Sequence, residues 1–272
     1  MNTRTQKTLT TLALLGLAAT GAHAQTASAS NSAQVLTSGI KSATSGTSFF
    51  NVEGTGNTKF ANYGVLDFST TGFSGVTSLN NATVTLTLTE SNTNFTAPGT
   101  IDFFLTTDTT TNDTPAISGG TQNTNLKFNA ADTANGVGVD SANFQSGAQF
   151  FALGNGAFTR TGATPTGGVD NYTLNFADAS TAARSYFLQQ IGAGGPLRIL
   201  VTPDANTPAV AATFAGSAFT SGTPAAPAPG SFPMLTIATP AAAPEPSGIA
   251  VLLIGMGALG LAAARRRTTQ AA

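Results

Sequence analysis

Thr83-Val84-Thr85-Leu86-Thr87-Leu88-Thr89 alternates threonine with aliphatic residues. A period of two places successive side chains on opposite faces of an extended strand. The aliphatic set would face a core, and β-branched threonine suits the exposed face of a half-buried sheet. The stretch therefore predicts a strand with Val84, Leu86 and Leu88 directed inward.

Similar short segments recur along residues 25–238, separated by Gly, Asn, Ser and Pro. Many short strands joined by turn residues are typical of a β-sandwich. We therefore predict an all-β fold, a single antiparallel β-sandwich spanning residues 25–238. The other expected strands are Ser48–Val52, Lys59–Phe68, Ile101–Thr106, Gln149–Leu153, Tyr172–Phe176, Leu197–Thr202, Val210–Phe214 and Met234–Ala238.

One segment has helical spacing. Ala183, Phe187 and Ile191 recur at every fourth position, which places them on one face of a helix. We predict one short helix, Asp178–Gly192, that starts with capping residues, ends at a glycine and covers an edge or end of the sandwich.

Two short motifs lie at the start of the strand series. Leu66-Asp67-Phe68-Ser69 ends one predicted strand, and Ala82-Thr83-Val84-Thr85-Leu86 begins the next. With the later helix and the closing Pro233-Met234-Leu235-Thr236-Ile237, this order resembles the DNRLRE family of bacterial surface jelly rolls. The resemblance implies a jelly-roll-like sandwich. The tryptophan usual in the helix of that family is absent here.

The N-terminus has the composition of a targeting segment. Arg4 and Lys7 precede the apolar stretch Leu9–Ala19, and Ala22-His23-Ala24 has the small-x-small pattern of a cleavage site. Residues 1–24 are therefore predicted to be a secretory signal peptide, cleaved between Ala24 and Gln25.

The C-terminus has a second targeting pattern. Pro244-Glu245-Pro246 precedes an uncharged, mostly apolar run, and Arg265, Arg266 and Arg267 follow it. A 17-residue helix would be about 25 Å long, at the short end of the range that spans a hydrocarbon core of about 30 Å. Arginines favour the cytoplasmic side. We predict that residues 239–247 form a spacer with the Pro-Glu-Pro motif, 248–264 a transmembrane helix and 265–272 a cytoplasmic tail.

These three parts, in this order, resemble the PEP-CTERM sorting signal. The resemblance implies a Gram-negative bacterium, in which the chain is held transiently in the inner membrane and processed by the protease-transpeptidase exosortase. It also implies delivery to the cell surface or extracellular matrix, in association with exopolysaccharide and biofilm. The likeness covers Pro244 to Arg267 and implies no activity for the rest of the chain.

Composition excludes several classes of function. The chain has no cysteine, and its one histidine, His23, lies in the predicted signal peptide. Ser-His-Asp and Cys-His catalysis are therefore excluded for the mature chain, and a conventional zinc, copper or haem site is nearly excluded. Residues 25–243 hold 11 acidic side chains against 6 Lys and Arg, which argues against nucleic-acid binding.

Paired carboxylates remain chemically open. Glycoside hydrolases hold two of them about 5 to 9.5 Å apart. Asp67, Glu90 and Asp102 are the candidates because they lie in or beside predicted strands, and the alternative is that they are ordinary surface or loop acids. We expect the second case and predict no catalytic residue.

Two loops carry oxygen ligands that suit Ca²⁺. Neither loop has the spacing of an EF-hand, so we expect no cofactor, with a structural calcium as the alternative. The residues are Asp108, Asn112 and Asp113 in one loop and Asp132, Asn135 and Asp140 in the other.

The three tyrosines, Tyr63, Tyr172 and Tyr186, could form a platform for sugars, although packing in a core or groove fits their predicted strand and helix positions better. The sequence as a whole predicts an exported, non-enzymatic protein of the cell surface or extracellular matrix. The alternatives are a carbohydrate-binding module of the matrix and, third, a polysaccharide-degrading enzyme.

Overall fold

The computed structural model describes residues 23–41, 49–57, 61–91, 96–114, 124–159, 168–176, 181–218 and 232–239. Apart from His23, these residues belong to one folded unit, Ala24–Thr239. The predicted transmembrane helix, the Pro-Glu-Pro motif and the arginine tail lie outside the described residues, as does Ala22.

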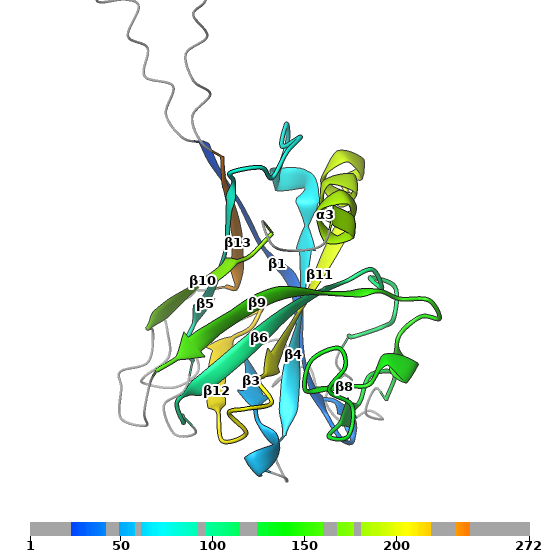
Figure 1. Ribbon diagram of the computed structural model, residues 1–272, viewed down its shortest axis with the longest axis vertical. Helices are drawn as coiled ribbons and strands as arrows, with labels where there is room; N and C mark the ends of the chain where they lie inside the picture. The colour runs from blue at the N-terminus through cyan, green and yellow to red at the C-terminus, as the bar shows by residue number, and fades with distance from the viewer. Residues whose placement is uncertain are drawn as a thin grey trace, which may run out of the picture. The chain divides into compact units, whose positions relative to one another are not determined.

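Antiparallel β-structure dominates this unit, as the sequence predicts (Figure 1). Eleven strands form one sheet whose main order is β10-β5-β13-β1-β4-β11-β6-β9; β3 and β12 pair beside β4, and β2 pairs with β1. The strands are β1 (His23–Leu36), β2 (Gly39–Ile40), β3 (Phe49–Glu53), β4 (Asn62–Ser69), β5 (Thr83–Thr89), β6 (Gly99–Thr106), β7 (Phe128–Asn129), β8 (Gly138–Val139), β9 (Phe150–Phe158), β10 (Val169–Leu174), β11 (Pro196–Pro203), β12 (Ala211–Ala215) and β13 (Met234–Thr239).

The alternation of Thr83–Thr89 is confirmed. Strand β5 has these bounds and pairs with β10 and β13. Its residues Val84, Leu86 and Leu88 are buried in the core. Thr85 and Thr87 are partly exposed on the other face, whereas Thr89 is buried.

Strand β1 was not predicted. Its sequence, HAQTASASNSAQVL, is rich in Ala and Ser, and only its last residues are strongly apolar. It is held by its position between β4 and β13, where the backbone is paired on both sides. Strand β1 begins at His23, so the predicted cleavage after Ala24 would remove two of its 14 residues.

The central strands are buried on both faces. On β4, Leu66 and Phe68 face a main core, while Tyr63 and Val65 face a second cluster. Apolar residues of segment 124–144 cover this second cluster, among them Leu126, Phe128, Val137, Val139 and Phe144. A strand with two buried faces reads as an apolar run, which explains the sequence Ile199–Val201 in β11.

The predicted helix is confirmed as α3 (Thr181–Ala193), with Ala183, Phe187 and Ile191 buried. The expected end at Gly192 is wrong by a residue. Gly194 has a φ of 63° and donates its N–H to Ile191 O at 3.2 Å, while Gly195 donates to Gln190 O at 2.9 Å. Glycine adopts this left-handed conformation without the steric cost of a Cβ atom. Short 3₁₀ turns are η1 (Thr55–Asn57), η2 (Thr70–Gly72) and η3 (Ser141–Asn143).

The first and last strands are neighbours. Ala29 N–H donates to Pro233 O at 2.8 Å, and Figure 1 shows the start of β1 beside the end of β13. The chain therefore enters and leaves the sheet at the same end. Within the described residues, α3 and the 3₁₀ turns include no helix with the length and apolarity needed to span a bilayer.

Candidate functional site

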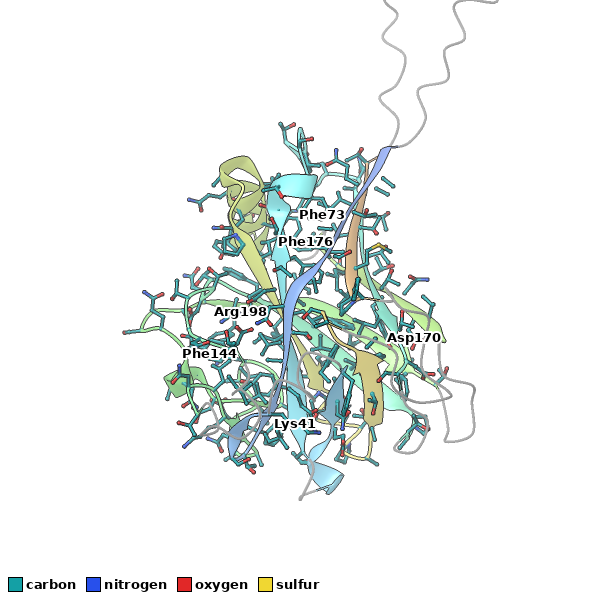
Figure 2. The ribbon with its side chains drawn as sticks, turned by 180° about the vertical axis from the view of Figure 1, so that it is seen from behind. Lys41, Phe73, Phe144, Asp170, Phe176 and Arg198 are labelled. Carbon is teal, nitrogen blue, oxygen red and sulfur yellow. The ribbon has the colours of Figure 1, made fainter. Side chains whose placement is uncertain are left out.

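A buried arginine, Arg198, organises a cluster of charged side chains (Figure 2). Arg198 on β11 is 2% exposed, and its Nε and Nη2 donate to the two carboxylate oxygens of Asp67 on β4 at 2.7 and 2.9 Å. The register of the sheet aligns these residues directly across the β4–β11 pair. A planar guanidinium matches a carboxylate in this two-bond geometry, so the pair is rigidly oriented.

The same guanidinium holds the segment that follows β6. Arg198 Nη1 donates to Thr111 O at 2.8 Å, and Nη2 lies 3.3 Å from Asp113 Oδ1. Asn31 Nδ2 on β1 donates to the same Oδ1 at 2.9 Å. The other oxygen, Asp113 Oδ2, is buried and makes no hydrogen bond within the described residues. One buried cation thus connects two strands to a loop and faces two carboxylates.

The unequal surroundings of Asp113 change its acidity. Burial, and then the charge of Asp67, raise the pKa of Asp113 to about 7, against the opposing effect of Arg198. A buried carboxylate with one unpartnered oxygen favours its neutral form for this reason.

Asp108 has the opposite balance. Burial acts to raise its pKa, but hydrogen bonds to both of its oxygens outweigh burial and hold the pKa well below its usual range. Its carboxylate accepts from the Thr110 and Thr111 amides, both at 2.9 Å, and from the Gln145 amide at 2.7 Å. The hydroxyls of Thr110 and Thr111 donate as well. Asp108 therefore fixes the loop against the segment before β9.

Asp113→Asn is expected to change how stability depends on pH. Because the folded protein raises the pKa of Asp113, the stabilising effect of its proton is complete below about pH 4 and is lost as the pH rises toward 7. Asparagine is neutral throughout, so we expect the variant to gain roughly 1 to 3 kcal/mol over the wild type between pH 4 and pH 8.

Urea denaturation at both pH values measures this difference. Asn112→Ser, a change between neutral side chains in the same loop, is the matched control and should leave the change between the two pH values as it is in the wild type. An equal response of both variants would contradict the assignment to Asp113.

The acids proposed for calcium are not brought together. Asp132 accepts from the amides of Ala134 and Ser141, and Asp140 accepts from Ala142 at the start of η3. Asp113 is engaged with Arg198 and Asn31. Among the described residues, no three acidic side chains are close enough to hold a metal ion. The absence of a cofactor stays a prediction, with a structural calcium as its alternative.

The three candidate catalytic acids lie in different places. Asp67 on β4, Arg198 on β11 and Thr106 on β6 lie opposite one another on three neighbouring strands. Asp102 lies four residues away from Thr106 along β6. Four residues of strand span about 13 Å, beyond the separation used by glycosidases. Glu90 is buried at the end of β5, where it bridges to Phe214 of β12. Burial and the nearby Asp204 raise the pKa of Asp102 to about 6.

The tyrosines form no shared platform. Tyr63 is buried in the second cluster and its ring centroid lies 6.5 Å from that of Phe128. Tyr172 packs against Phe103 at 4.9 Å in the main core, and Tyr186 on α3 donates to Thr107 O at 3.3 Å. Val169, 54% exposed, is the one exposed large hydrophobic side chain among the described residues.

Sequence reasoning missed the role of Arg198. One signal was present: it is the single charge within the apolar strand Leu197–Val201, and a charge in such a strand is retained when it is paired. The partners could not be named in advance because they lie 85 to 131 positions away in the chain. No family model matches the chain, and no curated protein matches it.

Proposed function

We propose that the chain is an exported, non-enzymatic protein of the cell surface or extracellular matrix, sorted by its C-terminal segment and associated with exopolysaccharide. The observation that carries the proposal is the order Pro-Glu-Pro, apolar run and arginine cluster between Pro244 and Arg267. Its resemblance to the PEP-CTERM signal makes exosortase and the inner membrane the transient partners.

The positions of the first and last strands support this proposal. Pro244 follows Thr239, the last residue of β13, by five positions, so cleavage at the motif would leave every strand intact. Cleavage before Gln25 would shorten β1 by two residues. Both targeting segments can therefore be removed without dismantling the sheet.

We further propose that the domain is a jelly-roll-like β-sandwich. Residues of β5, β10 and β13 contribute to the main core from one side, among them Leu86, Tyr172 and Leu235. Residues of β4, β6 and β11 contribute to the same core, including Phe68, Phe103 and Ile199. Two layers facing one core are what this architecture requires.

A structural role agrees with the polar groups. The arginine of the arginine–aspartate cluster holds a loop against two strands, and the candidate acids are spread over separate strands. A carbohydrate-binding module of the matrix is the second proposal, supported by polar residues on neighbouring strands, the partly exposed Thr85 and Thr87 and the exposed Asn171 and Thr173. A polysaccharide-degrading enzyme is the third.

Mass spectrometry of protein recovered from the native cell surface tests the sorting proposal. We expect mature chains that begin at Gln25 and lack Gly248–Ala272. Replacing Arg265, Arg266 and Arg267 by glutamine is expected to abolish processing or correct orientation, because moving an arginine across the bilayer centre costs several kcal/mol.

The matched control replaces Arg160, Arg184 and Lys127, three cations of the body, by glutamine. This control should be processed like the wild type. Surface protein that still carries the three C-terminal arginines would contradict sorting and leave a plain membrane anchor. A glycan array with the processed protein separates the structural role from the binding module.

A further inference from the structure

A lysine and a buried glutamate lie near three side-chain amides where β1 to β4 meet. Gln34 and Asn62 are each 1% exposed and Glu53 is 5% exposed. Lys41, labelled in Figure 2, directly follows β2, and its Nζ donates to Gln34 Oε1 at 3.4 Å. Glu53 pairs with Asn62 in the β3–β4 register. Charged and amide side chains thus share a largely buried region.

Strand β3 places two of these groups, Asn51 and Glu53, in a row with Phe49. Phe50 and Val52 face the main core, so Phe49, Asn51 and Glu53 lie on the other face, where successive side chains are about 7 Å apart. Lys41 Nζ lies 5.1 Å from the centroid of the Phe49 ring. At the other end, Asn51 Nδ2 donates to Glu53 Oε1 at 2.9 Å. Lys41 therefore lies at Phe49, one end of this row of side chains, and the amide of Asn51 is next in the row and is hydrogen-bonded to Glu53 at the other end.

The surroundings of Lys41 and Glu53 shift the pKa of each side chain toward its neutral form. Burial lowers the pKa of Lys41, although the charge of Glu53 opposes the change. Burial also raises the pKa of Glu53, against hydrogen bonds from Asn51 and Asn62. A neutral amine is a nucleophile, and a neutral carboxylic acid can deliver a proton. The two groups are not joined by a direct ion pair within the described structure.

We propose that Lys41 and Asn51 form an intramolecular isopeptide bond, with Glu53 as the proton carrier. The lone pair of Lys41 Nζ attacks Asn51 Cγ, and the Cγ–Nδ2 bond breaks. The carboxyl group of Glu53 gives its proton to Nδ2, the atom to which it is already hydrogen-bonded, and takes one from Nζ. Ammonia leaves, the acid is regenerated, and no oxidant or other reactant is required.

Gln34 is the positioning residue of this reaction, since its Oε1 holds the lysine nitrogen. The bond would join the end of the β1–β2 hairpin to β3 covalently. The inference is independent of the proposed location and function of the protein.

Peptide mapping of the purified full chain tests the bond. The linked protein is expected to be lighter than its sequence by about 17 Da, the mass of the ammonia released. Trypsin should leave the peptide bond after Lys41 uncut, since the side-chain amine that trypsin recognises would have become an amide. Chymotrypsin cuts after Phe50, between the two residues, and the resulting peptides should remain joined.

Three variants, Lys41→Arg, Asn51→Ala and Glu53→Gln, should each restore the full mass, whereas Lys127→Arg should keep the loss. Cyclisation of Gln25 at the N-terminus of a processed chain also releases ammonia, so the chymotryptic linkage decides the result. If a variant fails to fold, the wild-type map is sufficient by itself. Complete tryptic cleavage after Lys41 would overturn the assignment. So would a mass loss that persists in Asn51→Ala but disappears in Gln34→Ala, because the lysine would then be joined to Gln34.

Discussion

Leu86→Asp is expected to unfold most of the protein at room temperature. Leu86 is fully buried, and its β5 position aligns with Tyr172 on β10 and Leu235 on β13. The change removes a core side chain, at about 2 to 5 kcal/mol, and buries a charge without a partner. Total stabilities are typically about 5 to 15 kcal/mol, so a large share of the folded state would be lost. Circular dichroism during urea denaturation measures this effect.

Thr85→Asp is the matched control, one position away on the same strand. Thr85 is partly exposed on the opposite face of β5. An aspartate there remains in contact with water, so a change within about 1 kcal/mol is expected. Similar losses in both variants would mean that both faces of β5 are buried equally.

Arg198→Met is expected to cost about 3 to 5 kcal/mol, because it leaves the partly buried carboxylate of Asp67 and the buried Asp113 without their cation. The methionine side chain keeps much of the length of arginine, so lost packing contributes less than the lost pairing. Arg198→Lys should fall between the variant and the wild type, because an ammonium cannot make the two-bond contact with Asp67.

A triple replacement separates charge from packing. Combining Arg198→Met with Asp67→Asn and Asp113→Asn removes all three charges and should recover a large part of the lost stability. Denaturant midpoints for the single and triple variants provide the comparison. A single variant within about 1 kcal/mol of the wild type would show that the ion pair contributes little.

The elements that the sequence predicted correctly are those with an apolar pattern. Strand β5 alternates, β11 is apolar from Leu197 to Val201 except for Arg198, and α3 repeats every fourth residue; each pattern reports which faces are buried. Strand β1 lacks such a pattern because its small and polar side chains contribute less to burial than its backbone pairing does. Local propensity does not contain that information.

The polar cluster shows the second limit of sequence reasoning. Asp67 was considered as a catalytic acid and Asp113 as a calcium ligand, and both contact Arg198. Their proximity depends on the β4–β11 register and on the course of the loop after β6. Both features depend on residues far apart in the sequence, so the spacing of residues within a single motif cannot predict them.

The pairing of β1 with β13 has a consequence for how the protein reaches its native state. Ala29 and Pro233 are hydrogen-bonded although they lie near opposite ends of the domain's sequence. The sheet therefore cannot be completed until its final strand has been synthesised. Contacts of such large sequence separation slow folding, since the long loop between them must close first. An unfinished chain would leave the edges of β1 and β5 open for as long as β13 is missing. The last six residues of the domain, Met234–Thr239, therefore control when both open edges are closed.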